Sequence, residues 1–134
     1  MNILGISAFY HDSAAALIKD GKIVAAAQEE RFSRKKHDER FPFNAVRYCL
    51  HEGKVGPEEL DAVAFYDKPI TKFVRILKTY FSVAPKGLES FMMAMPLWMR
   101  EKLWIPLEME ESIEQCGITK RPDLYFPEHH ESHA

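Results

Sequence analysis

Three histidines fall within the last six residues of the 134-residue chain, at a spacing suited to binding a metal ion. His129 and His133 are four residues apart, so on a helix both imidazoles would lie on one face, within reach of one ion. Neutral imidazole binds zinc, iron and related ions, so these histidines alone do not select the metal. Two ligands do not hold an ion tightly, and the neighbouring residues supply no evident third one. Histidines at this spacing are also common on ordinary helix surfaces, and that interpretation stays open.

A second candidate site is the pair His11-Asp12, in the short segment 8–12 that joins two apolar runs. An imidazole changes its charge near neutral pH, and beside a carboxylate at the end of a strand it is suited to acid–base chemistry. The alternative is that Asp12 caps a turn and His11 is a solvated loop residue. Spacing alone does not decide between the two.

The third candidate is the charged segment 28–40, which mixes both signs of charge around one large apolar residue, Phe32. Most such runs are solvated loops. Alternatively, its basic side chains, Lys36 and His37 among them, form a rim over a phosphate or carboxylate. The sequence leaves both interpretations open.

Apolar strands must position these segments. Short apolar runs predict strands near residues 2–7, 13–19 and 22–28. Asp20-Gly21 between the second and third runs is typical of a type I′ hairpin, because glycine accepts the positive φ that this turn needs. The sequence therefore predicts antiparallel pairing in this region, with the elbow 8–12 feeding the hairpin.

Two shorter elements follow the charged segment. Asn44 is a good N-cap, and the apolar stripe over 45–52 predicts a helix that ends at Gly53. Residues 57–60 predict a single helical turn with proline in its first-turn position.

Residues 70–117 carry the longest helical pattern, which prolines are expected to cut into short helices, at Pro85, Pro96 and Pro106. A strand near 61–66 is either a sheet member or an edge. A last strand near 123–127 is expected to run parallel to the first strand and beside it, with the helical segment as the crossover. Methionine and tryptophan concentrate between residues 92 and 109, which indicates adaptable packing of short helices, a partner surface or a wall of the acceptor pocket.

Composition narrows the class of protein. A net charge of −2 argues against a general nucleic-acid binder. The longest charge-free apolar run, 91–99, falls short of the roughly 18 residues that span a bilayer, and no signal peptide is visible at the first residues. Two cysteines, Cys49 and Cys116, favour free thiols in a reducing cytoplasm over a disulfide scaffold.

Taken together, three motifs resemble the O-carbamoyltransferases that modify nodulation factors and antibiotics such as cephamycin and tobramycin. The first runs from Gly5-Ile6-Ser7 to His11-Asp12-Ser13-Ala14-Ala15-Ala16. The second is Glu29-Glu30-Arg31-Phe32 with Lys36-His37-Asp38 and Phe41-Pro42. The third is His129-His130-x-x-His133-Ala134. They occur in the family's order and span nearly the whole chain.

The resemblance implies an α/β fold, a mixed sheet with flanking helices like the first half of an actin-like ATPase (ribonuclease H-like) domain. It implies carbamoyl transfer from carbamoyl-adenylate, made from carbamoyl phosphate and ATP, to a hydroxyl of a small-molecule or sugar acceptor. His129 and His133 would then hold a divalent metal, iron or a similar ion, that binds the phosphate of the adenylate. His11 and Asp12 would act at the acceptor hydroxyl, and Lys36 and His37 would bind the cofactor.

The departure from the family is length. Residues 1–134 correspond to the N-terminal part of the catalytic domain, so a third metal ligand, expected to be an aspartate, and the adenylate-forming domain would lie outside this chain. The chain alone is expected to be inactive, and neither the acceptor nor the oligomeric state can be read from it.

Two alternatives remain. One is an ATP-hydrolysing, kinase-like member of the actin-like superfamily, which would place an Asp-x-Gly pattern in the first strand. Gly5-Ile6-Ser7 carries no acid there and favours transfer. The other is a non-catalytic, metal-binding fragment.

Overall fold

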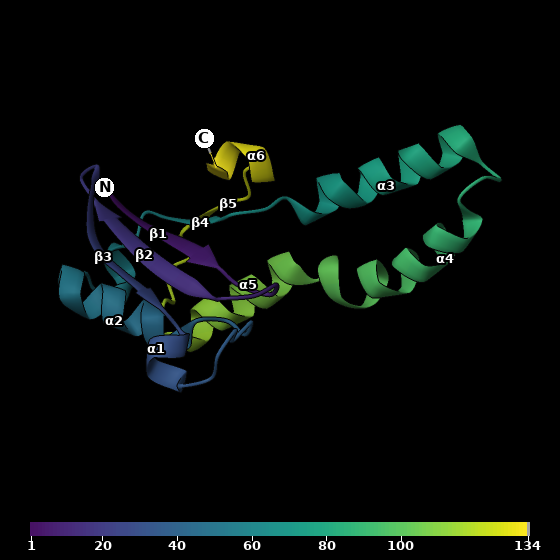
Figure 1. The fold of residues 1–134 in the computed structure, drawn as a ribbon. Helices are drawn as coiled ribbons and strands as arrows, with labels where there is room; N and C mark the ends of the chain where they lie inside the picture. The colour runs from purple at the N-terminus through teal and green to yellow at the C-terminus, as the bar shows by residue number, and fades with distance from the viewer. Residues whose placement is uncertain (134) are drawn as a thin grey trace.

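The computed structural model describes residues 1–133, with the side chains of all except Glu101 and His133. This part of the chain is built on a five-stranded sheet in the order β3-β2-β1-β4-β5 (Figure 1). The strands are β1 (Asn2–Ser7), β2 (Ala14–Lys19), β3 (Lys22–Gln28), β4 (Ala62–Phe65) and β5 (Asp123–Tyr125). β1 pairs antiparallel with β2 and parallel with β4. The predicted fold class, a mixed sheet with flanking helices, is confirmed.

The first three strands form the predicted antiparallel meander. Leu4 pairs with Leu17 across β1 and β2, and Ala16 pairs with Ala26 across β2 and β3. Asp20 and Gly21 both have positive φ, 50° and 79°, as a type I′ hairpin requires. The Asp-Gly signal in the sequence therefore located this turn correctly.

The position of the last strand differs from the prediction. β5 runs parallel to β1 as expected, but β4 lies between them, so β5 pairs with β4 and not with β1. Val63 of β4 is buried and pairs with Leu4 on one side and Leu124 on the other. An apolar strand such as β4 gains most by taking the interior position, which leaves the short, largely polar β5 as the edge.

Helices connect and cover the strands. They are α1 (Glu30–Ser33), α2 (Phe43–Gly53), a 3₁₀ turn (Pro57–Glu59), α3 (Pro69–Val83), α4 (Leu88–Leu97), a π-helical turn (Trp98–Lys102), α5 (Ile105–Gln115) and α6 (His129–His133). Together with the π-helical turn at its base, α3 and α4 form an arm that projects away from the sheet (Figure 1). Pro96 was expected to break a helix but lies inside α4. The chain continues from there into the π-helical turn, so the winding changes next to the proline instead of stopping.

One face of the sheet carries the hydrophobic core. α2 and α5 cover this face (Figure 1), and they contribute buried side chains such as Val46, Cys49 and Met109. Leu4, Leu17, Val63 and Phe65 meet them from the sheet, and the alternation of buried positions along β1 and β2 follows from the two-residue period of a strand. Cys49 and Cys116 are free thiols, buried and half-buried respectively.

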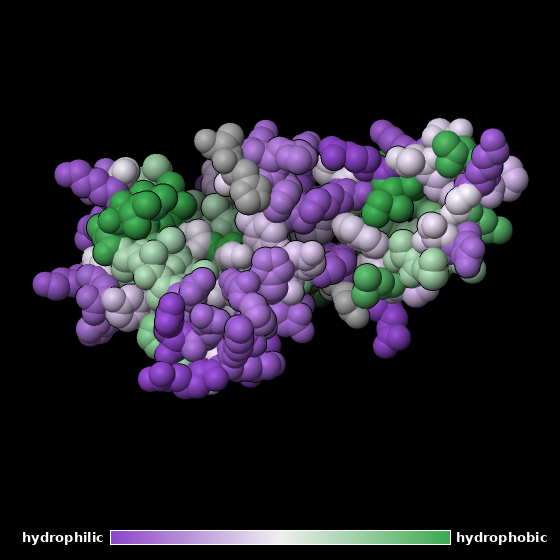
Figure 2. All heavy atoms as spheres, in the orientation of Figure 1, coloured by the Kyte–Doolittle hydropathy of each residue, from purple (hydrophilic) through white to green (hydrophobic). Residues whose placement is uncertain are grey.

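Apolar side chains also reach the surface. Figure 2 shows them gathered over the β-hairpin and again over the arm. On the arm, Met92, Met93 and Met99 are 62%, 69% and 59% exposed, whereas Met109 is buried in the core. Adaptable packing therefore accounts for Met109 and not for the methionines of the arm. No helix within residues 1–133 is long and apolar enough to cross a membrane.

Candidate active site at the carboxyl edge of the sheet

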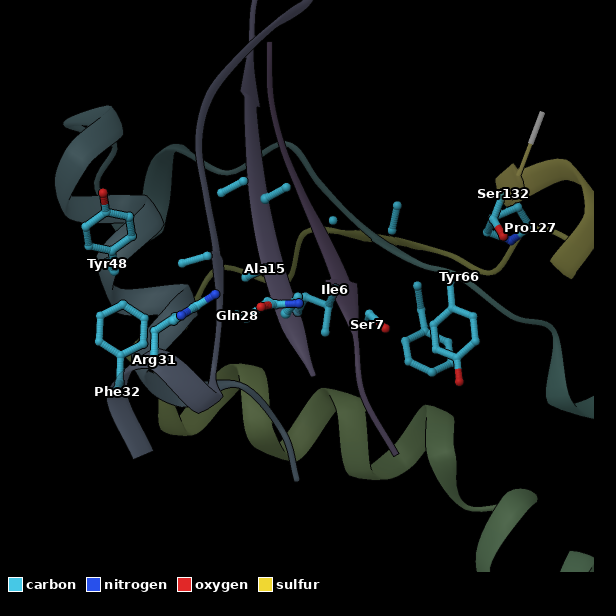
Figure 3. A pocket seen from close by; sticks show the side chains of 17 residues that line it. Ile6, Ser7, Ala15, Gln28, Arg31, Phe32, Tyr48, Tyr66, Pro127 and Ser132 are labelled. Atoms are coloured by element: carbon cyan, nitrogen blue, oxygen red, sulfur yellow. The ribbon is translucent and has the colours of Figure 1, made fainter. Parts of the chain in front are cut away.

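The segments singled out in the sequence are carried to one edge of the sheet. β1, β4 and β5 are parallel, so their carboxyl ends lie on the same side. β1 leads into the elbow 8–12, β4 into Tyr66-Asp67, and β5 into the segment that begins α6. Figure 3 shows Ser7, Tyr66 and Ser132 on this side of the sheet. Ligands of α/β proteins bind outside the carboxyl ends of strands, which makes this edge the candidate site.

At its centre, one carboxylate holds two imidazoles. Asp12 Oδ2 lies 3.0 Å from His11 Nδ1, and Asp12 Oδ1 lies 2.9 Å from His37 Nδ1. With Asp12 ionised, each Nδ1–H donates to it, which leaves both Nε2 atoms for other partners. The hydrogen bond from His37, supported by that from His11, lowers the pKa of Asp12 below its ordinary value of 3.8. The arrangement orients two groups of acid–base chemistry toward solvent.

The backbone of this cluster is held in an unusual conformation. Phe9, Asp12 and His37 all have positive φ, at 67°, 47° and 55°. Left-handed backbone is costly for residues with a Cβ, and it persists where surrounding contacts fix it, often at functional sites. Here the segment 37–40 fixes it: Phe9 N–H donates to the Glu39 carbonyl at 2.7 Å, and Ser13 N–H to the Asp38 carbonyl at 2.9 Å.

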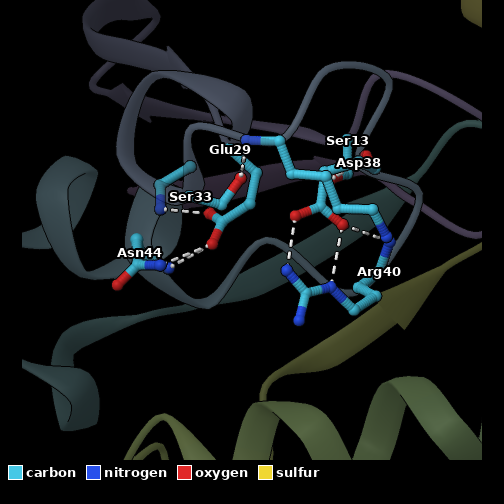
Figure 4. A network of polar contacts seen from close by, with 8 residues as sticks. Ser13, Glu29, Ser33, Asp38, Arg40 and Asn44 are labelled. Atoms are coloured by element: carbon cyan, nitrogen blue, oxygen red, sulfur yellow. Dashed lines mark hydrogen bonds and ion pairs between the residues drawn. The ribbon is translucent and has the colours of Figure 1, made fainter.

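The charged segment is anchored by a buried acid that the sequence reading missed. Asp38 is fully buried and accepts two hydrogen bonds from the Arg40 guanidinium, at 2.9 and 2.6 Å (Figure 4). This bidentate pair holds the pKa of Asp38 well below its ordinary range. The Ser13 hydroxyl also donates to the Asp38 carbonyl, at 2.8 Å. The elbow and the segment after α1 therefore form one rigid unit.

A second buried acid, Glu29, fixes the start of α2 (Figure 4). Its Oε2 accepts the Ala45 N–H at 2.8 Å, and its Oε1 accepts the Asn44 side-chain amide at 2.6 Å. Asn44 was predicted to be the N-cap, but α2 begins at Phe43, so Asn44 lies in the first turn of the helix. Glu29 supplies the cap instead, from 16 residues away in sequence.

The exposed face of the sheet next to the cluster forms a hollow of about 860 Å³. Its floor consists of glycine and alanine from the first four strands, at Gly5, Ala14, Ala16, Ala26 and Ala64. Gln28, Arg31 and Tyr48 stand at one side and Tyr66, Pro127 and Ser132 at the other (Figure 3). Such small residues allow close approach by a ligand or a packed element. Burial raises the pKa of Tyr66, so its phenol stays protonated.

The structure brings some of the predicted site residues together and leaves others apart. His11, Asp12 and His37 are joined directly, and Lys36 is exposed on the same segment as His37. His129 lies half-buried with its ring edge against Tyr66, at a centroid distance of 5.9 Å. α6 confirms the helix that the His129–His133 spacing assumed, but the side chain of His133 lies outside the described residues.

The residues fit a metal ion only in part. Within the described side chains, no three of the His, Cys, Asp and Glu residues come together in a way that could hold an ion. The histidine pair of α6 is the candidate that the sequence supplies, and a complete site needs ligands beyond it.

The chain belongs to a known family. Residues 2–134 match the family described as Carbamoyltransferase N-terminus, so the resemblance noted in the sequence is confirmed. Over 99% of its own length, the chain is 52% identical to protein sll1178 of Synechocystis sp.. Over 43% of its own length, it is 41% identical to nodulation protein NolNO of Sinorhizobium fredii. It covers 22% of the first relative and 8% of the second.

A solved structure, YeaZ from Pseudomonas aeruginosa, is similar over 48% of this chain and 28% of its own, with 20% identity and a TM-score of 0.36. A likeness at this level carries no argument about the site.

Proposed function

We propose that the chain is the N-terminal part of a longer O-carbamoyltransferase, in which His11 and Asp12 act on the acceptor hydroxyl and Lys36 and His37 bind the donor. Family membership supports carbamoyl transfer in general. The observation that carries the assignment of the site is the Asp12 carboxylate between the two imidazoles. The small coverage of the relatives supports a longer protein.

In the proposed reaction the donor is carbamoyl-adenylate, formed from carbamoyl phosphate and ATP elsewhere in the longer protein. His11 Nε2 takes the proton of the acceptor hydroxyl, and the hydroxyl oxygen forms a bond to the carbamoyl carbon. The bond from that carbon to the phosphate oxygen breaks and AMP leaves. Asp12 holds His11 in the tautomer that presents Nε2 as an acceptor. The exposed Lys36 supplies positive charge toward the phosphate of the donor, and His37 binds the donor beside it on the same segment.

His129 and His133 are retained as proposed ligands of a divalent ion, iron by resemblance. Their place beyond the carboxyl end of β5 supports this, because it lies on the same edge of the sheet as the elbow. The remaining ligands would come from the longer protein. Bound there, the ion would neutralise charge on the donor phosphate.

Kinase-like chemistry is disfavoured by the end of β1. Gly5-Ile6-Ser7 completes that strand without a carboxylate, whereas a phosphoryl-transfer member of the superfamily would carry its metal-binding acid there. The acceptor is proposed only as a small molecule or sugar with a free hydroxyl.

The test measures turnover of the longer protein with carbamoyl phosphate, ATP and a panel of sugars and aminoglycosides. Turnover is monitored by the release of AMP and by the increase in mass of the acceptor. His11→Ala is expected to lower turnover by roughly a hundredfold or more, with metal content unchanged. His51→Ala is the matched control, since the His51 side chain is 85% exposed near the end of α2 and pairs with its neighbour Glu52. If His11→Ala loses the metal, His11 is a ligand and its proposed role is wrong.

A further inference from the structure

The elbow that carries His11 receives a contact from a distant part of the chain. Lys102, in the π-helical turn Trp98–Lys102, donates from Nζ to the Phe9 carbonyl at 3.0 Å. The two residues are 93 positions apart, and Lys102 is partly buried at this contact. Hydrogen bonds from a charged donor are stronger than neutral ones, so this is a substantial tie between the arm and the elbow.

Lys102 also reaches the ring that stands next to His11. Its Nζ lies 5.8 Å from the centroid of the Tyr10 ring, a cation–π distance. The Tyr10 ring in turn lies 4.5 Å from the His11 ring, centroid to centroid. A continuous set of contacts therefore runs from Lys102 through Tyr10 to His11 and on to Asp12.

The elbow needs such support because of its backbone. Phe9 has a φ of 67°, which is unfavourable for a residue with a Cβ. Its N–H is held by the Glu39 carbonyl and its carbonyl is held by Lys102, so both peptide groups of this residue are fixed. Removal of the ammonium would leave the Phe9 carbonyl without this hydrogen bond and loosen the elbow at that peptide.

Two hydrogen bonds stabilise the π-helical turn. The Trp104 indole N–H donates to the Met99 carbonyl at 2.9 Å, and Leu103 N–H donates to the Trp98 carbonyl. π-helical turns inside α-helices recur at functional sites, where they present a residue that regular winding would point elsewhere. Lys102 is the residue that this turn presents to the elbow.

From these contacts we infer that Lys102 is a positioning residue for His11, coupling the α3–α4 arm to the acid–base cluster. The inference deepens the proposed function and rests on it for its catalytic consequence. Lys102 touches no reacting atom: it acts through the Phe9 carbonyl and the Tyr10 ring.

The test compares Lys102→Met, which keeps the length of the side chain and removes its charge, with Lys102→Arg, which restores a cationic donor. Lys78→Met is the matched control, because Lys78 is an exposed lysine of α3. Hydrogen exchange by mass spectrometry on the longer protein reports the elbow directly, whatever its activity. We expect about tenfold faster amide exchange over residues 8–13 in Lys102→Met, recovery in Lys102→Arg, and no change in Lys78→Met.

Kinetic measurements on the same variants distinguish a positioning role of Lys102 from a general effect on stability. Lys102→Met should lower kcat by about tenfold with KM for the carbamoyl donor unchanged, and Lys102→Arg should restore most of it. Unchanged exchange over residues 8–13 would overturn the inference. Faster exchange together with wild-type kcat would overturn the coupling to His11. Absence of carbamoyl transfer in the wild type would count against the proposed function, while the exchange result would still decide whether Lys102 holds the elbow.

Discussion

Asp12 Oδ1 lies 2.9 Å from His37 Nδ1, a contact that joins two segments 25 residues apart in the sequence. Because the other oxygen of the same carboxylate binds His11, a single acid orients both imidazoles. The motif His11-Asp12 and the charged segment, which are separate in the sequence, are therefore one site. This explains why a resemblance based on both motifs points to one chemical function.

Asp12→Asn should impair this site without unfolding the protein. The amide cannot accept from both imidazoles at once, so we expect turnover of the longer protein to fall by at least about tenfold. The pKa of Asp12 is lowered by folding, so its contacts contribute fully above the ordinary value of 3.8 and are lost as pH falls below it. The Tm difference between the wild type and Asp12→Asn should therefore shrink between pH 7 and pH 3. Asp123→Asn, at an exposed acid, is the control, and a Tm difference that does not change with pH would contradict the assignment.

Asp38→Asn tests the buried anchor of the charged segment. The substitution removes the ionic bonds to Arg40, and we expect a loss of about 1.5–3 kcal/mol in the free energy of unfolding at pH 7. Since Arg40 holds the pKa of Asp38 far below 3.8, the wild type keeps this contribution above that pH and loses it progressively as the pH falls from 3.8 toward the lowered pKa, so that part of it is lost at pH 3. Urea unfolding at pH 7 and pH 3 measures both effects. Glu39→Gln, which removes an exposed acid at the next position, should change little.

The sequence was most informative where local chemistry decides structure. The short apolar runs and Asp20-Gly21 predicted β1, β2 and β3, because strand formation and turn type depend largely on neighbouring residues. The roles of Glu29 and Asp38 could not be predicted, since a run of mixed charge does not say which acids turn inward. Their partners are set by tertiary packing: Glu29 finds the start of α2, and Asp38 finds Arg40 and Ser13.

The same limit applies to the site. The elbow and the histidine helix were recognised from their residue types, but their common location depends on the parallel pairing of β1 with β4 and of β4 with β5. Lys102 had no signal in the sequence, because nothing near it indicates a contact 93 residues away. The family resemblance identifies the motifs, but it does not specify the contacts between them.

Glu29→Gln tests the cap of α2. The amide keeps the shape of the side chain but loses the charge that faces the N-terminus of the helix, and one of its two acceptors becomes a donor. We expect the free energy of unfolding to fall by about 1–2 kcal/mol. Glu110→Gln makes the same change at an exposed position of α5 and should be close to neutral. Equal effects of the two substitutions in urea unfolding would show that Glu29 does not cap α2.

The last prediction concerns metal binding by residues 1–134 alone. A catalytic metal site usually has three protein ligands plus open positions, and this chain offers the pair His129 and His133 on α6. Because no three potential ligands come together among the described side chains, we expect the chain to bind iron(II) only weakly and the longer protein to bind one ion tightly. Calorimetric titration of both proteins under anaerobic conditions measures this difference, with His129→Ala and His133→Ala as test variants and His51→Ala as the control. Either test variant should abolish the weak binding by the chain and lower the metal content of the longer protein. Tight, stoichiometric binding by the chain that survives both substitutions would place the metal elsewhere and remove α6 from the site.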